Sequence, residues 1–249
     1  MKFQDKVVII TGAGSGIGRA TSLLYAQNGA QVIVSDIAPK GGEETVRLIT
    51  EAGGKASFIE ANVAKLDEVE NLINETVAQF GKIDIAVNNA GIGDFNQKKT
   101  AEHPVDSWDK VIAVNQTGVF YCMKMELQQM MKQGSGNIVN VSSVAGLRGL
   151  PNNLAYVASK HAVVGMTKTA AMEYAKHNIR INAVCPVFTL TNLFQPQFFG
   201  DKAEKLKANI PMKRYGKVEE IAEAIAWLSA SNSSFVTGHI MPVDGGTTA

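Results

Sequence analysis

Short, uninterrupted apolar runs rich in β-branched residues recur along the chain, separated by longer segments whose apolar positions repeat every three or four residues. Such short runs are typical of strands buried on both faces, and the periodic segments are typical of amphipathic helices. The runs predict strands at residues 7–10, 32–35, 56–59, 83–87, 138–141, 179–184 and 240–243. The periodic segments predict helices at residues 17–28, 43–52, 67–80, 106–132, 155–177 and 218–229.

Strands and helices alternate throughout, which predicts βαβ crossovers and a doubly wound parallel sheet of about seven strands with helices on both faces. No linker or compositional shift divides the 249 residues, so we expect one α/β domain over residues 1–249. The alternation breaks at residues 188–215, where prolines, phenylalanines and a short Lys-rich helix at 201–208 occur. Insertions of this length often act as lids, and a surface excursion is the alternative interpretation.

Composition limits the class of partner and the location. The 24 Lys and Arg balance 23 Asp and Glu, so no basic surface for nucleic acid or anionic lipid is indicated and a small-molecule partner is expected. The two cysteines form no CxxC pair, and the four histidines lack metal-ligand spacing, so no disulfide or metal site is predicted. The first apolar run is too short for a signal peptide, and no stretch of about 18 apolar residues occurs, which predicts a cytoplasmic protein without a membrane span.

A glycine-rich turn joins the first strand to the first helix. Gly12, Gly16 and Gly18 would let the backbone approach a pyrophosphate at the helix N-terminus, where free N–H groups and the helix dipole favour an anion. Asp36 ends the second strand, 18 residues beyond Gly18, where a carboxylate can accept hydrogen bonds from the adenosine ribose. The strand, turn, helix and acid together predict a dinucleotide site, although Asp36 alone is also compatible with an ordinary turn.

Four motifs agree in order and spacing with one known family. They are Gly12-x3-Gly16-x-Gly18, Asn88-Asn89-Ala90-Gly91, Ser143 after the fifth strand with Asn115 before it, and Tyr156-x3-Lys160. On these motifs the chain resembles, over essentially its whole length, the compact single-domain short-chain dehydrogenase/reductase family. The resemblance implies a Rossmann-type fold and hydride transfer between a nicotinamide cofactor and a ketone or secondary alcohol.

The resemblance assigns catalysis to Asn115, Ser143, Tyr156 and Lys160. Reducing a carbonyl requires a proton donor at its oxygen, and Tyr156 is the candidate. A free tyrosine has a pKa near 10, and an ammonium four residues further along the helix, at Lys160, favours its phenolate. Ser143 would hold the substrate oxygen, while family likeness gives Lys160 a second bond to the nicotinamide ribose and Asn115 a water-linked proton relay. Singly, each residue is also compatible with an ordinary structural role.

We expect NAD(H) rather than NADP(H), because Asp36 would repel a 2′-phosphate and the positions where NADP-preferring relatives carry basic residues hold Ser15 and Ile37. Arg19 and Lys40 are the nearby cations that oppose this preference. Two positions depart from the family pattern: Asn62 replaces an aspartate at the adenine, and Val187 replaces the glycine after Pro186. The expected cofactor-binding residues are Gly12, Ser15, Gly16, Ile17, Gly18, Asp36, Ile37, Asn62, Val63, Asn89, Ala90, Gly91, Tyr156, Lys160, Pro186, Thr189 and Thr191.

The substrate is expected to be an uncharged, hydrophobic ketone or its secondary alcohol, because the residues expected around the carbonyl are mostly apolar. These are Ser143, Ala145, Leu147, Leu150, Asn153, Tyr156, Val187, Phe188 and Leu193. Reduction of 3-oxoacyl groups on a carrier protein is an alternative that the net charge of +1 does not favour. The intact Ser143, Tyr156 and Lys160 argue against a non-catalytic dinucleotide sensor, and the glycine spacing argues against a sugar-nucleotide epimerase. Family likeness also predicts a homotetramer that pairs helices 106–132 and 155–177 and the terminal strands.

Overall fold

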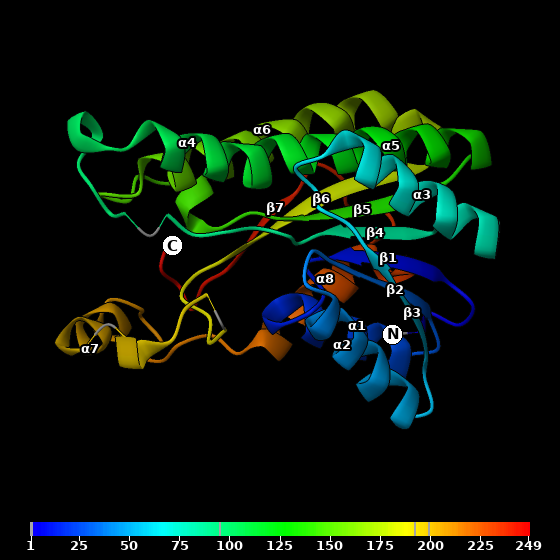
Figure 1. Cartoon of the computed structure of the whole chain (residues 1–249), viewed down its shortest axis with the longest axis horizontal. Coiled ribbons are helices and arrows are strands. Elements are labelled where there is room, and N and C mark those ends of the chain that lie inside the picture. Colours follow the sequence, from blue (N-terminus) through cyan, green and yellow to red (C-terminus); the bar gives the residue numbers. More distant parts are fainter. Residues whose placement is uncertain (1, 95, 192, 199) are drawn as a thin grey trace.

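The computed structural model describes residues 2–94, 96–191, 193–198 and 200–249, and it contains a seven-stranded parallel sheet in the order β3-β2-β1-β4-β5-β6-β7 (Figure 1). The strands are β1 (Val7–Thr11), β2 (Gln31–Asp36), β3 (Lys55–Glu60), β4 (Ile85–Asn88), β5 (Gly136–Val141), β6 (Ile179–Pro186) and β7 (Ile240–Val243). The strand order reverses direction beside β1, because β2 lies on one side of it and β4 on the other. The predicted doubly wound α/β fold is therefore confirmed.

Helices cover both faces of the sheet. The helices α1 (Gly16–Gln27), α2 (Pro39–Glu51) and α8 (Val218–Ser229) lie on one face, and α3 (Leu66–Phe80), α4 (Val105–Ile112), α5 (Gly118–Gln133) and α6 (Leu154–Tyr174) lie on the other (Figure 1). Helix α7 (Asp201–Ala208) projects beyond the sheet. None of the helices in the described part of the chain has the length and apolar composition that crossing a membrane would require.

The central strands are apolar on both faces because each face packs against its own helical layer. In β1, Val8 and Ile10 belong to the core beneath α1 and α8, whereas Val7 and Ile9 belong to the core beneath α3, α5 and α6. Successive side chains of a strand point to opposite faces, so this continuous apolar run supplies both cores. Ile33 of β2 likewise lies in the second core and is fully buried.

The helix predicted at residues 106–132 is instead interrupted. A π-helical turn, Ala113–Thr117, separates α4 from α5 and contains the buried Asn115. Gly118 follows this turn against the loop after β3, and a Cβ there would lie 2.9 Å from the Val63 Cγ2 atom. Apolar periodicity continues through the segment and therefore cannot reveal the extra residue of a π turn.

The segment at residues 188–215 contains α7 and an aromatic cluster at its base. The Phe194 ring lies 5.0 Å from that of Phe188 and 5.1 Å from that of Tyr215, measured between centroids. The Tyr215 hydroxyl donates a 2.5 Å hydrogen bond to the Ala203 carbonyl oxygen of α7. The aromatic cluster thus anchors the short helix predicted at residues 201–208 to the start of the segment.

Candidate functional site

The loops that carry the predicted site residues meet at one edge of the sheet. In parallel strands all carboxyl ends lie at the same edge, and ligands bind there where the strand order reverses. The glycine turn follows β1, the Asn89–Gly91 segment follows β4, Ser143 follows β5, and Val187 follows β6. The fold therefore brings these four loops together.

The glycine turn is too closely packed for side chains at its key positions. A Cβ at Gly12, whose φ is +63°, would lie 2.8 Å from the Ala90 Cα atom. At Gly18, a Cβ would lie 2.2 Å from the Gly12 carbonyl oxygen. Helix α1 begins at Gly16, and the Ser15 side chain makes no capping hydrogen bond. The free N–H groups of this first turn can therefore receive a pyrophosphate, so the turn fits the phosphates of a dinucleotide.

Asn89 holds this turn in place. Its Nδ2 atom donates hydrogen bonds of 2.9 Å to the Thr11 carbonyl oxygen and 3.0 Å to the Gly12 carbonyl oxygen. The Thr11 hydroxyl oxygen accepts 3.2 Å hydrogen bonds from the backbone N–H groups of Asn89 and Ala90. The side-chain amide that we expected to bind cofactor is thus engaged by the turn itself.

Asp36 lines a cavity of about 860 Å³ that is also lined by Gly14 and Ser15. Its Oδ2 atom accepts a 2.8 Å hydrogen bond from the Gly14 N–H, and its Oδ1 atom accepts a 2.9 Å hydrogen bond from the Ala38 N–H. Each carboxylate oxygen retains a second lone pair that can accept a ribose hydroxyl. Ile37, the next residue, is 62% exposed. The acid thus stands where a ribose could reach it.

The two residues expected to contact the adenine, Asn62 and Val63, lie in the loop after β3 and have different environments. The Asn62 Oδ1 atom accepts a 3.0 Å hydrogen bond from the Ala64 N–H, so its amide nitrogen remains available as a donor. Val63 is 7% exposed and packs with Val69 and Cys122. Asn62 therefore retains polar capacity, whereas Val63 is mostly a packing residue of this loop.

Ser143 and Tyr156 form the centre of the candidate active site. Ser143 follows β5 and is 9% exposed, and its Oγ atom accepts a 3.1 Å hydrogen bond from the Ala145 N–H. Tyr156 lies in the first turn of α6, close enough to Ser143 for that side chain to influence the phenol. The protein around the phenol desolvates it and raises its pKa above the ordinary value, although the nearby Ser143 side chain acts in the opposite direction. The two hydroxyl-bearing residues thus lie at one site, and their catalytic roles stay a prediction.

Lys160 is buried beside this pair. Its Nζ atom donates a 2.9 Å hydrogen bond to the Val141 carbonyl oxygen and lies 5.7 Å from the centroid of the Tyr156 ring. Burial lowers the lysine pKa to about 8. Desolvation dominates the Tyr156 pKa in this structure, so the expected lowering of that pKa by Lys160 stays a prediction.

Asn115 occupies the π turn and binds the chain next to Gly91. Its Nδ2 atom donates to the Ile92 carbonyl oxygen and its Oδ1 atom accepts from the Ile92 N–H, both at 2.8 Å. A Cβ built on Gly91 would lie 3.2 Å from Asn115 Oδ1 and 3.6 Å from Lys160 Nζ. The asparagine and the lysine therefore face the same glycine, as the sequence motifs imply.

The loop after Pro186 passes over the glycine turn despite the Val187 replacement. Val187 is 8% exposed and does not adopt a positive φ. The Thr189 hydroxyl donates a 2.9 Å hydrogen bond to the Val187 carbonyl oxygen, so it is engaged within its own loop. A Cβ at Gly16 would lie 3.3 Å from the Thr191 side chain, which places this threonine directly beside the turn.

The expected substrate residues differ in exposure. Ala145 is 2% exposed and lies behind Ser143, whereas Leu193 is 46% exposed. Leu147, Leu150, Asn153 and Phe188 have intermediate exposure. Asn153 precedes α6 and donates a 3.0 Å hydrogen bond to the Pro151 carbonyl oxygen.

Sequence reasoning assigned no active-site role to Cys185. It is fully buried in β6, and its thiol lies near Lys160 and the Ser142 side chain, although burial still raises its pKa. A single cysteine in an apolar strand gives no signal of this proximity. The described residues contain no group of three or more His, Cys, Asp or Glu side chains that could hold a metal ion.

Comparisons with known proteins agree with this geometry. A family model described as enoyl-(acyl carrier protein) reductase matches residues 12–248. The chain is 44% identical over 249 residues to a cyclohexanol dehydrogenase of Acinetobacter sp. strain SE19, covering 100% of this chain and 97% of that protein. It is 43% identical over 247 residues to a 3-oxoacyl-(acyl-carrier-protein) reductase of Thermotoga maritima, covering 99% of each.

A solved structure extends the agreement to the backbone. The crystal structure of levodione reductase superposes with a TM-score of 0.95 at 38% identity and covers 98% of both chains. The glycine turn, the Ser143–Tyr156 pair and Lys160 thus occur in a chain that is similar to dehydrogenases and reductases over its full length. This protein belongs to the short-chain dehydrogenase/reductase family and is an oxidoreductase that uses a nicotinamide dinucleotide with alcohols or ketones.

Proposed function

We propose that this protein transfers a hydride between NAD(H) and a hydrophobic, uncharged ketone or its secondary alcohol. The observation that carries the proposal is the proximity of the Ser143 and Tyr156 side chains at the same sheet edge as the glycine turn and the Asp36 carboxylate. A bound nicotinamide would supply or accept the hydride, which is chemistry that amino-acid side chains do not provide. The residues of the chain would bind and orient the cofactor and the substrate and would exchange the proton.

The four polar residues would divide this work. The Tyr156 hydroxyl would donate a proton to the carbonyl oxygen during reduction and accept it during oxidation. Ser143 would hold that oxygen by a hydrogen bond. Lys160 Nζ would bind the ribose beside the nicotinamide, and Asn115 would connect the lysine to solvent through water. The 3.2 Å and 3.6 Å approaches of Asn115 Oδ1 and Lys160 Nζ to a Cβ built on Gly91 support this last connection.

The preference for NAD(H) follows from charge at the ribose end. The Asp36 carboxylate accepts hydrogen bonds from the backbone N–H groups of Gly14 and Ala38, and these bonds orient it. A 2′-phosphate beside this carboxylate would suffer like-charge repulsion at close range. Arg47, a cation of the same cavity, is paired with Glu44 at 2.8 Å and Glu51 at 2.5 Å.

A 3-oxoacyl group on a carrier protein remains the second candidate substrate, favoured by the 43% identity to the Thermotoga maritima reductase.

The location and the oligomeric state also belong to the proposal. We expect a cytoplasmic location and a homotetramer in which the helical segments 106–132 and 155–177 and the terminal strands pair with their copies. The 50% exposure of Phe120 on α5 and the 85% exposure of Met172 on α6 support such an interface, and light scattering at micromolar concentration would measure its mass.

The decisive experiment follows NADH and NADPH absorbance with a panel of substrates. The panel contains alkyl and aryl methyl ketones, cyclic ketones, a 3-oxoacyl thioester, 2-oxo acids and sugars. We expect the highest kcat/KM for an apolar ketone with NADH. Preference for a charged or polyhydroxylated compound would refute the substrate class, and preference for NADPH would refute the cofactor.

A further inference from the structure

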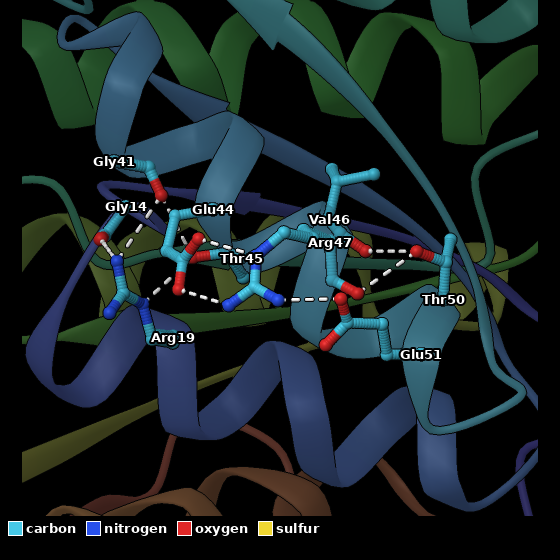
Figure 2. Close-up of polar contacts among 9 residues, drawn as sticks. All are labelled: Gly14, Arg19, Gly41, Glu44, Thr45, Val46, Arg47, Thr50 and Glu51. Atoms are coloured by element: carbon cyan, nitrogen blue, oxygen red, sulfur yellow. Dashed lines mark hydrogen bonds and ion pairs between the residues drawn. The ribbon is translucent and has the colours of Figure 1, made fainter.

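Arg19 lies on α1, immediately after the last glycine of the turn, and its side chain reaches across to α2 (Figure 2). The guanidinium donates through Nη2 to the Gly14 carbonyl oxygen and, at 3.3 Å, to the Gly41 carbonyl oxygen. Its Nε atom donates a 2.9 Å hydrogen bond to the Thr45 hydroxyl oxygen. Three of the five N–H groups of this guanidinium thus bind the protein itself.

Thr45 completes the connection between the turn and α2. It is fully buried, and its hydroxyl donates a hydrogen bond, 2.9 Å long, to the Ala13 carbonyl oxygen. Arg19 and Thr45 therefore hold two consecutive carbonyl groups of the turn, those of Ala13 and Gly14. The Gly14 N–H donates to Asp36 Oδ2 at 2.8 Å, so the same residue connects the arginine to the ribose-end acid.

The packing around Gly14 is tight enough to transmit this constraint. A Cβ built on Gly14 would lie 2.7 Å from Asp36 Oδ2 and 3.1 Å from the Gly41 carbonyl carbon. A shift of the Gly14 backbone therefore changes the position of the Asp36 carboxylate or disrupts its hydrogen bond. Closely packed groups move together, because no space is available to absorb the displacement.

Arg47 lines the same cavity but has different partners. Its guanidinium forms two 2.8 Å hydrogen bonds with the Glu44 carboxylate and one of 2.5 Å with Glu51, all within α2 (Figure 2). None of these bonds involves the glycine turn. Arg19 and Arg47 therefore carry the same charge and line the same cavity, but only Arg19 forms hydrogen bonds with the glycine turn.

We propose that Arg19 is a positioning residue for the dinucleotide: it fixes the Gly14 peptide and thereby orients Asp36, and it does not select for a 2′-phosphate. The inference rests on the dinucleotide-binding function proposed above and deepens it. Because a pre-organised site does not lose affinity to ordering, removal of Arg19 should weaken NADH binding, and it should weaken NADPH binding less, since a displaced Asp36 carboxylate also repels a 2′-phosphate less. The proton-transfer groups lie on other elements, so kcat at saturating cofactor should persist.

The experiment compares Arg19→Met, Arg19→Lys and the matched control Arg47→Met in the full-length protein. Kd values for NADH and NADPH come from cofactor-fluorescence titration, and kcat and KM come from ketone reduction. We expect Arg19→Met to raise the NADH Kd and the NADH KM about tenfold, the scale of one lost charge-assisted hydrogen bond, and to raise the NADPH Kd less. Arg19→Lys, which keeps a donor for the Gly14 carbonyl, should recover part of the loss. Arg47→Met should leave the NADH Kd unchanged.

Three outcomes would overturn the inference. An unchanged NADH Kd in Arg19→Met, even with a lower melting temperature, would show a purely structural role. A selective loss of NADPH binding would show that Arg19 reads the phosphate. An equal loss in Arg47→Met would show that cavity charge is responsible. If the unmodified enzyme prefers NADPH, the proposed NAD preference fails, whereas weaker NADH binding in Arg19→Met with unchanged kcat still supports positioning.

Discussion

Glu126 of α5 is a buried carboxyl outside the catalytic site, and it should make stability depend on pH. It is 1% exposed, and its Oε2 atom accepts a 3.0 Å hydrogen bond from Asn88 Nδ2. Burial raises its pKa from 4.5 to about 7. The folded state therefore favours the protonated acid, and this contribution is complete below pH 4.5 and is lost as the pH rises through 7.

The size of the effect follows from the pKa shift. Each pKa unit corresponds to about 1.4 kcal/mol, so ionising the buried Glu126 lowers the free energy of unfolding by roughly 3 kcal/mol at high pH. Between pH 5 and 8 the linkage relation gives a loss of about 2.5 kcal/mol. Glu126→Gln keeps the shape and the acceptor oxygen for Asn88 but cannot ionise, so this part of the pH dependence should disappear.

Urea unfolding of the wild type and Glu126→Gln at one protein concentration, from pH 5 to 8, measures the difference. The glutamine variant should become progressively more stable relative to the wild type as the pH rises. Glu75→Gln, at an exposed position on α3, is the matched control and should follow the wild type. A wild-type-minus-Glu126→Gln difference that stays constant over this range would refute the reasoning.

Three predictions concern the active site. Tyr156→Phe should remove nearly all turnover while leaving the NADH Kd unchanged, because only the proton-transfer hydroxyl is lost; substantial kcat in the folded variant would contradict the mechanism. Asp36→Ala should raise the ratio of NADPH to NADH kcat/KM by about tenfold or more, the scale of removing like-charge repulsion near a phosphate, and an unchanged ratio would exclude that role. Lys160→Met should lower kcat and weaken NADH binding, because the proposed contact of Lys160 with the nicotinamide ribose is lost. Since burial lowers the Lys160 pKa from 10.5 to about 8, the unfolded wild type binds more protons in that window. Its stability relative to Lys160→Met should therefore rise with pH from about 8 to 10.5 in urea titrations, and a flat difference would contradict this assignment.

The sequence predicts the relative placement of the candidate catalytic residues where local geometry suffices. Tyr156 and Lys160 are four residues apart in a helix and must share a face, and the Nζ atom indeed lies 5.7 Å from the ring centroid. The acceptor of the lysine, the Val141 carbonyl oxygen, lies on another element, so no spacing rule identifies it. The effect of Lys160 on the Tyr156 pKa therefore depends on tertiary contacts and stays a prediction.

The sequence alone determined the alternation of strands and helices, the parallel sheet and the loops that hold the site. Buried strands need two apolar faces, so they have continuous apolar sequences. The turn at Gly12 and Gly18 admits no Cβ, so glycines occupy these positions. Both features can be recognised in the local sequence. Tertiary structure alone decided which groups lose water and which partners they meet. It buried Glu126, gave Arg19 its acceptors on the turn and α2, and brought Ser143 to Tyr156. Desolvation and hydrogen bonding depend on residues distant in sequence, and a side chain acquires these neighbours only when the sheet and its helical layers pack together.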